Sequence, residues 1–435
     1  MNRQLFAAIL LFLPVALFAN DSPGFRGDSG HPGVYDIAPL AKFSQLKWKF
    51  KTKGVVLSSP AVVGGTLFIG SADHNLYAVD VATGNQKWAF KTGSSVASSP
   101  AVAQGIVYFV SYDGSLYAVD AVTGQLRWKF QTGGEHRFAA KHLHGSQPVA
   151  ETMPDPFDVY LSSPLVWQGS VFFGSGDGNV YSLDAATGKL NWKFQTGNVV
   201  HASPTIAGGN LYIGSWDSYF YSLDAATGRQ RWRFKTGEDP EIHNQEGIQS
   251  SAVVADGIVY FGCRDSNLYA LDADTGEKKW SYDNKGSWVI ASPIVYEGKV
   301  YFATSDSGMF RAVNAKTGAD IFTLKFSGWP TFSSPSIARG MLYVGSHSGK
   351  LYAIDLGQQK TAWEFQTEGA RQNGAAYTNA DGTPNYQAAF AGDFYDDMVA
   401  GVRKLMTVGA IYSSPVLVDG VLYFGSTDGY LYALM

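Results

Sequence analysis

The chain has 435 residues, of which 16% are charged and 14% aromatic, and its formal net charge is −4. This length allows a large core, and many aromatic residues with few charges favour a β protein over a helical or disordered one. No basic stripe indicates a nucleic-acid partner. The single cysteine, Cys263, excludes an intrachain disulfide and a cysteine-rich metal site.

The first 19 residues have the layout of a secretory signal peptide. Arg3 precedes an apolar run from Leu5 to Ala19, which is too short to span a bilayer comfortably. We expect cleavage after Ala19, export to the periplasm or the medium, and a tail over residues 20–44 that docks on the ring described below. No cysteine follows the run, so we expect no lipid anchor there, and we expect no transmembrane span in the mature chain.

A unit of about 40 residues recurs from residue 45 to the C-terminus. Four clear copies of one part are LYAVDVATGNQKWAFKTG (Leu76–Gly93), LYAVDAVTGQLRWKFQTG (Leu116–Gly133), VYSLDAATGKLNWKFQTG (Val180–Gly197) and FYSLDAATGRQRWRFKTG (Phe220–Gly237). Weaker copies begin at Leu268, Phe310 and Leu351, and a truncated copy, LYALM, ends the chain. Each unit holds four short alternating runs bounded by Gly, Asp and Asn, which predicts four strands.

The two ends of the repeat complete each other. The last copy stops after its third strand, and the segment Gln45–Thr52 is a fourth strand with no partners of its own. Pairing the two removes the open edges that a solenoid would leave. The sequence therefore predicts an all-β fold over residues 45–435, an eight-bladed β-propeller of four-stranded antiparallel blades that the N-terminal strand closes.

Residues that recur in every unit indicate packing. An Asp-x-x-Thr-Gly turn uses the Asp side chain to bond its own backbone, and a tryptophan on the next strand can wedge between blades. The recurring residues are Asp80, Gly84, Trp88, Asp120, Gly124, Trp128, Asp184, Gly188, Trp192, Asp224, Gly228, Trp232, Asp272, Gly276 and Trp280. A serine before a marker proline, as in Ser59-Pro60, suits a crowded innermost strand.

The pattern Ala78-x-Asp80-x-x-Thr83-Gly84-x-x-x-Trp88 resembles the tryptophan-docking motif of the PQQ-type, or quinoprotein-like, eight-bladed propellers. That family includes quinoprotein alcohol dehydrogenases and the outer-membrane assembly scaffold BamB. The resemblance therefore implies the fold strongly and the function weakly.

Three insertions interrupt the repeat, at 131–160, 236–247 and 366–410, before blades three, five and eight. Because strands in a blade alternate in direction, all three must emerge on one face, where long loops on a rigid scaffold commonly form a site. The stretch GDFYDDMVAGVRKLM predicts the one real helix, with Asp393 as its cap and Phe394, Met398, Val402 and Leu405 packed on the ring.

The candidate site residues lie in these insertions or at positions where one blade departs from the others. The candidates for binding a ligand or partner are Glu135, His136, Arg137, Lys141, His142, His144, His201, Trp216, His243, Gln249, Arg264, Arg371, Asn373, Asp396 and Asp397. They equally suit a structural role in supporting the inserted loops.

Three functions are open at this point. His136, His142 and His144 could hold a metal ion whose bound water is a nucleophile, although Arg137 and Lys141 next to them oppose a cation. The family resemblance implies a dehydrogenase that binds PQQ with calcium, but the chain has no adjacent-cysteine pair and no recognisable calcium ligands. We favour a non-catalytic binding or scaffold propeller, monomeric, which binds an envelope protein, a peptide or a small molecule without a confident cofactor, because no complete catalytic set is visible.

Overall fold

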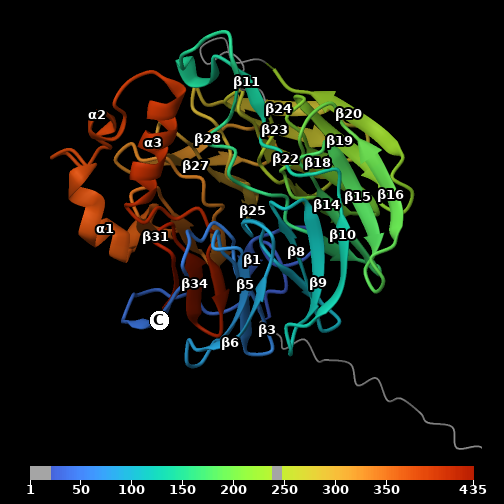
Figure 1. The fold of residues 1–435 in the computed structure, drawn as a ribbon. Helices are drawn as coiled ribbons and strands as arrows, with labels where there is room; N and C mark the ends of the chain where they lie inside the picture. The colour runs from blue at the N-terminus through green and yellow to red at the C-terminus, as the bar shows by residue number, and fades with distance from the viewer. Residues whose placement is uncertain (1–20, 238–246) are drawn as a thin grey trace, which may run out of the picture.

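The computed structural model describes residues 21–237 and 247–435, which form a ring of eight blades (Figure 1). The expected signal peptide, residues 1–19, lies outside the described residues. Blade one consists of β3 (Ala61–Val63), β4 (Thr66–Gly70), β5 (Asn75–Asp80) and β6 (Gln86–Lys91), and blade two of β7 (Ala101–Ala103), β8 (Ile106–Ser111), β9 (Ser115–Asp120) and β10 (Leu126–Gln131). Blade three consists of β13 (Leu165–Trp167), β14 (Ser170–Gly174), β15 (Asn179–Asp184) and β16 (Leu190–Gln195), and blade four of β17 (Thr205–Ala207), β18 (Asn210–Gly214), β19 (Tyr219–Asp224) and β20 (Gln230–Lys235).

Blades five to eight continue the order, with the innermost strand first. Blade five consists of β21 (Val253–Ala255), β22 (Ile258–Gly262), β23 (Asn267–Asp272) and β24 (Lys278–Asp283), and blade six of β25 (Ile294–Tyr296), β26 (Lys299–Ala303), β27 (Met309–Asn314) and β28 (Asp320–Lys325). Blade seven consists of β29 (Ser336–Ala338), β30 (Met341–Gly345), β31 (Lys350–Asp355) and β32 (Lys360–Gln366), and blade eight of β33 (Val416–Val418), β34 (Val421–Gly425), β35 (Tyr430–Leu434) and β2 (Leu46–Lys51).

The ring closes as the sequence predicts. β2 pairs antiparallel with β35, so that Trp48 lies opposite Ala433 and Lys51 opposite Tyr430. The backbone N–H of Met435 also donates to the carbonyl of Gln45 at 3.0 Å. Residues from the two ends of the chain therefore share one blade, and the predicted propeller with its N-terminal closing strand is confirmed.

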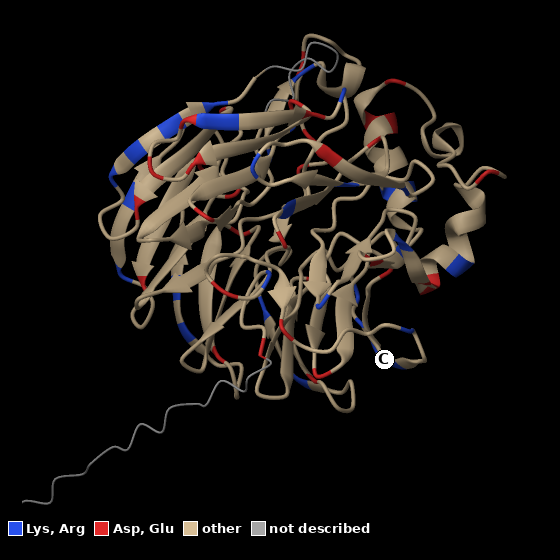
Figure 2. Cartoon of the chain, turned by 180° about the vertical axis from the view of Figure 1, so that it is seen from behind, with Lys and Arg blue, Asp and Glu red and all other residues tan. Residues whose placement is uncertain are grey.

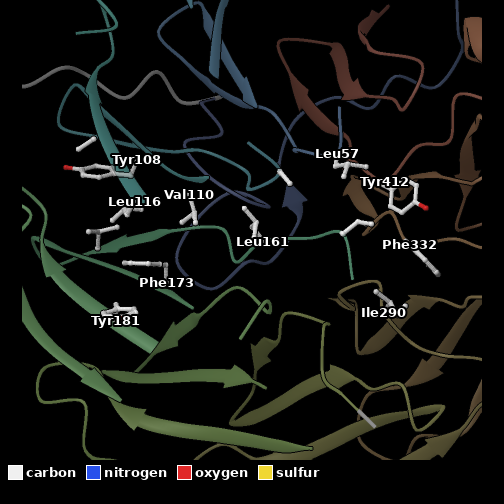
Figure 3. Close-up of a cluster of buried hydrophobic side chains, with 14 of the residues drawn as sticks. Leu57, Tyr108, Val110, Leu116, Leu161, Phe173, Tyr181, Ile290, Phe332 and Tyr412 are labelled. Atoms are coloured by element: carbon white, nitrogen blue, oxygen red, sulfur yellow. The ribbon is translucent and has the colours of Figure 1, made fainter. Parts of the chain in front are cut away.

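The core lies between the faces of neighbouring blades. The second strand of a blade is buried on both sides, as in β4, whereas the outermost strand alternates between exposed and half-buried residues, as in β10. One cluster of buried side chains joins several inner segments, and Figure 3 shows its members Leu57, Leu161, Ile290 and Phe332. Lys and Arg gather on the outermost strands (Figure 2), and charged residues at an exposed edge discourage pairing with another chain.

The outer-strand tryptophan of most blades binds the following blade, whereas Trp363 donates to the carbonyl of Leu40 in the segment before the ring. The indole Nε1 of Trp128 donates to the carbonyl of Ala185 at 3.1 Å, and the ring covers Gly188, whose φ is +73°. A Cβ at Gly188 would lie 2.5 Å from the Trp128 ring, so the turn needs glycine both for its conformation and for this contact. The same hydrogen bond recurs at Trp48, Trp88, Trp192, Trp232 and Trp280.

Serines join the blades around the axis. The backbone N–H of Ser59 donates to the hydroxyl of Ser99 at 3.0 Å, and that of Ser414 donates to the hydroxyl of Ser59 at 2.8 Å. Equivalent bonds link Ser99, Ser163, Ser203, Ser251, Ser292 and Ser334 in succession. The serine before each marker proline thus provides a hydrogen bond across the blade boundary in addition to its small size.

The segment before the ring lies along the innermost strands. Ser22 bridges to Val62, and β1 (Val34–Tyr35) runs parallel to β29. Arg26 is fully buried and donates to the carbonyl of Pro293 at 2.8 Å. These contacts involve residues within or directly before the first strand of several blades, so the segment lies along the inner edge of the ring.

The third insertion contains more helix than predicted. It forms α1 (Glu368–Asn373), α2 (Tyr386–Ala389), α3 (Tyr395–Met406) and the 3-10 turn η2 (Gly374–Ala376). The cap prediction for Asp393 is wrong, since the N-cap is Phe394, whose backbone is extended. The reason is a contact outside the helix, because Gln147 pairs with this segment and its carbonyl accepts from the Tyr395 N–H at 2.9 Å.

The apolar face predicted for this helix is partly correct. Met398 and Val402 are buried, and Leu405 is half-buried. Phe394 lies before the first turn and is 59% exposed, so it does not pack on the ring.

Candidate functional site

The first and third insertions meet over one face of the ring and form what we call the cap (residues 133–160 and 367–409). In the first insertion, β11 (Ala139–Lys141) pairs with β12 (Thr152–Pro154), and the 3-10 turn η1 (Leu143–Gly145) lies between them. The N–H of Gln147 donates to the Asp393 carbonyl at 2.8 Å, and the Tyr395 hydroxyl donates to the Pro154 carbonyl at 2.7 Å. The predicted convergence of these two insertions on one face is thereby confirmed.

A cavity of about 840 Å³ separates the cap from the ring. The ring contributes residues from the connections on the insertion face, and the cap contributes residues from both insertions. The ring side chains are Trp288, Asp306, Trp329, Pro330, Phe332 and His347; those of the cap are His142, His144, Ser146, Phe157, Tyr386, Phe390, Asp393, Met398 and Leu405. Its size and its aromatic walls are those of a small-molecule site.

Beside this cavity, a buried polar network fixes the first insertion to the ring. The His201 imidazole contacts Asp158 through Nδ1 at 2.7 Å and Glu135 through Nε2 at 3.3 Å. Glu135 also accepts from the Gly176 N–H at 2.6 Å, and Gln249 donates to Asp158 at 3.1 Å. The sequence indicated His201 and Gln249 because other blades carry an apolar residue at these positions. In the structure both side chains bind carboxylates of the first insertion, His201 those of Asp158 and Glu135 and Gln249 that of Asp158.

Arg264 is the centre of the same network. Its guanidinium lies 4.4 Å from the ring centre of Trp216 and 4.3 Å from that of Trp288. It donates through Nε to Gln249 at 2.8 Å and through Nη1 to Asp155 at 2.5 Å. Such a stacked and paired guanidinium holds a fixed position without water.

The electrostatics follow from these pairs. Burial opposes the charged form of His201, but Asp158 and Glu135 outweigh it and raise the imidazole pKa to about 10. Burial likewise opposes ionisation of Asp155, yet Arg264 and then His144 hold the pKa of its carboxyl well below the usual range. The network therefore consists of cations and carboxylates that compensate each other inside the protein.

The three histidines of the metal hypothesis do not form a ligand set. His142 and His144 are in the left-handed conformation around η1, with φ of +53° and +55°, and not in an extended segment. His144 contacts Asp155 at 3.1 Å, while His136 and His142 are exposed. Within residues 21–237 and 247–435 no group of three or more His, Cys, Asp or Glu side chains could hold a metal ion.

Three further candidates, Lys141, Arg137 and Trp216, do not line the cavity. Lys141 is exposed on β11, and Arg137 is exposed with its guanidinium 5.9 Å from the Tyr112 ring centre. The Trp216 ring stacks on Phe138 at 4.3 Å and is buried. His243 lies outside the described residues.

The polar candidates of the third insertion belong to its helices. Arg371 on α1 lies 5.2 Å from the Phe365 ring centre, and Asn373 donates to the Thr407 carbonyl at 2.8 Å. Asp396 and Asp397 occupy the first turn of α3, where negative charge suits the helix N-terminus. These residues therefore support the cap and do not line the cavity.

The residues present do not fit PQQ with calcium. PQQ carries three carboxylates, yet the cavity lining contains two carboxylates, Asp306 and Asp393, and no Lys or Arg. Arg264, the guanidinium behind Trp288, is already paired with Asp155. An anionic cofactor would meet repulsion there without compensation.

Sequence reasoning missed Asp306 and His347, although the repeat contained a signal for both. They lie in the turn between the second and third strands, like Trp216 and Arg264, and this turn faces the cap in every blade. His347 occupies the same turn position as Trp216 and Arg264, and it lines the cavity. Comparing this one position across the blades would have identified it.

The fold and the site together define the class of protein, which is a closed ring of PQQ-type repeats with an aromatic cavity under a cap. A family model described as outer membrane protein assembly factor BamB matches residues 40–154, 158–286 and 242–435, and the chain belongs to this family. Outer membrane protein assembly factor BamB of Yersinia pestis is 25% identical over 166 residues, which are 35% of this chain and 34% of that protein. The Salmonella typhimurium protein of the same name is 29% identical over 86 residues, 18% of this chain and 22% of its own. The alignments thus span at most about a third of these relatives.

Solved structures share the fold over nearly the whole chain. The structural alignment with BamB from Moraxella catarrhalis covers 90% of this chain and 97% of the Moraxella chain, with a TM-score of 0.63 and 16% sequence identity. The alignment with a europium-containing methanol dehydrogenase covers 96% of this chain and 98% of the dehydrogenase chain, with a TM-score of 0.70 and 14% sequence identity. Both similarities concern the fold alone. Across the described part of the chain, no helix is long and apolar enough to cross a membrane.

Proposed function

We propose that this chain is an exported, non-catalytic binding propeller of the cell envelope, which holds a small molecule or a short peptide segment in the cavity under the cap. One observation carries the proposal: a cavity of about 840 Å³ with aromatic walls, enclosed by insertions that a buried ionic network fixes in place. Side chains held in this way form a preorganised site, which lowers the entropic cost of binding.

The family supports the non-catalytic reading and the envelope location. The matched relatives are named as outer membrane protein assembly factors and not as enzymes. The insertions give this chain a cavity of its own, so the ligand need not be that of the relatives. An envelope protein could bind through an exposed segment that enters the same cavity.

The test compares ligand binding by three forms of the full chain. Leu405→Trp adds an indole to the cavity wall on α3, and Val122→Trp adds the same group to a turn where the side chain is 83% exposed, on the opposite face. Thermal shifts are measured with a panel of neutral, cationic and anionic small molecules and short peptides. At least one class should shift the wild type and Val122→Trp equally and Leu405→Trp much less. If no compound discriminates between the two tryptophan variants, the cavity is not a binding site.

A further inference from the structure

The charges of the cavity restrict what it can bind. Its lining has two carboxylates, Asp306 and Asp393, and no Lys or Arg. His347 adds no positive charge near neutral pH, because burial lowers the pKa of its imidazole to about 3. Of the other two histidines in the lining, His144 is paired with Asp155 and His142 is exposed. The two carboxylates therefore favour a neutral or cationic ligand over an anionic one.

Asp306 differs from the aspartates at the same turn in other blades. In blade one, Asp73 accepts from the Tyr77 hydroxyl at 2.7 Å and from the Lys53 N–H at 2.8 Å, so its carboxylate is engaged in the ring. The same Asp–Tyr hydrogen bond occurs at Asp113, Asp177, Asp217, Asp265 and Asp428.

In blade six the turn is one residue longer, and Arg311 stands where the other blades have tyrosine. The Arg311 side chain turns away to Asn284 and Tyr282, with hydrogen bonds of 2.9 Å to each. Asp306 thus has no tyrosine to bind, and it lines the cavity, where burial raises the pKa of its carboxyl while the charges of His144 and Arg264 oppose that rise.

Aromatic residues line the same cavity as this carboxylate. Asp306 follows Ser305, whose N–H donates to the Trp288 carbonyl at 3.0 Å. Tyr386 lies close on the cap side, and burial together with the Asp306 charge raises the pKa of its hydroxyl. Trp329 and Phe390 line the same cavity. Aromatic faces around a carboxylate attract a cation that also has an apolar surface.

We propose that the cavity binds a small organic ammonium ion, a quaternary or alkylated amine, with its charge next to Asp306 and its alkyl groups against Trp288 and Tyr386. This inference rests on the proposed function, since it names the ligand class of the same cavity. A simple metal cation would gain little from the aromatic walls, and a neutral ligand would leave the unpaired Asp306 carboxylate without a partner.

The experiment titrates the full chain with choline and with 3,3-dimethyl-1-butanol, its neutral isostere, and follows tryptophan fluorescence and heat. We expect choline to bind at least about tenfold more tightly than the isostere, since removing the charge removes the cation–π and ionic terms. Asp306→Asn should abolish that preference at unchanged Tm. The matched control Asp396→Asn, an exposed carboxylate outside the cavity, should retain it.

Equal binding of choline and its isostere, or an Asp306→Asn variant that still prefers the cation, would overturn the ammonium assignment. So would absence of choline and tetramethylammonium binding to the wild type. If neutral or anionic compounds then bind and Leu405→Trp blocks them, the ligand class is wrong but the cavity function stands. If nothing binds in the cavity, both fail.

Discussion

Replacing Arg264 with methionine should destabilise the propeller by about 3–5 kcal/mol, the usual cost of breaking a buried ion pair. The guanidinium is fully buried between two tryptophan rings and pairs with Asp155, whose side chain is also fully buried. Methionine keeps much of the apolar volume but removes the charge. Asp155 would then remain in the interior with the His144 imidazole and the Phe157 N–H as its partners.

The assay is urea unfolding at pH 7, followed by tryptophan fluorescence. Arg231→Met is the matched control, because Arg231 is exposed and pairs with Asp224 at 2.6 Å on the surface. That change should cost no more than about 1 kcal/mol. The double variant Arg264→Met/Asp155→Asn should recover at least half of the loss, since asparagine removes the uncompensated charge.

Two outcomes would refute this reasoning. If Arg264→Met is no more destabilising than Arg231→Met, the buried ion pair does not hold the cap. If Asp155→Asn adds to the loss in place of relieving it, the cost comes from packing between the tryptophans and not from the unpaired carboxylate.

Three further predictions concern stability and reactivity. Neighbouring carboxylates outweigh burial and raise the pKa of His201 from its ordinary value to about 10. The stability that its positive charge provides is therefore complete below about pH 6.5 and is lost as the pH rises through 10. The decline of Tm over this range should be smaller in His201→Gln, and an unchanged slope would contradict the assignment. Gly188→Ala should lose about 1–3 kcal/mol more than Gly169→Ala in urea unfolding, because both glycines have positive φ but only the first would place a Cβ against a tryptophan ring. The thiol of Cys263 is buried, and burial raises its pKa, so Ellman's reagent should react with it only after denaturation; reaction in the native state would show that blade five opens.

The fold could be predicted because each blade repeats the same local chemistry. The Asp-x-x-Thr-Gly turn, the outer tryptophan and the serine before proline each recur, so one error in one blade is corrected by the others. The closing strand was predictable for a different reason. Gln45–Thr52 carries the outer-strand pattern without a blade of its own, and LYALM lacks that strand.

The candidate site was predictable in part. His201 could be found because it stands where other blades carry an apolar residue, and Arg264 because it is an outlier in a turn between the second and third strands. Nothing in the sequence identifies Asp158 and Asp155 as their partners. Those pairs depend on how a loop without repeats folds back on the ring. Contacts of this kind have no periodic signal, which is also why the N-cap of α3 was predicted incorrectly.

The closure of the ring by β2 and β35 affects how the molecule can be made. β2 and β35 are paired in one blade, but the strands of all the other blades lie between them in the sequence, so β2 must wait until those strands have been synthesised before it finds its partner. Until they pair, β2 and β35 each present a free edge, and edges of this kind pair readily with other chains. The last few residues should therefore control the yield of folded protein far more than their number suggests, and their removal should lead to aggregation and not to a smaller stable ring.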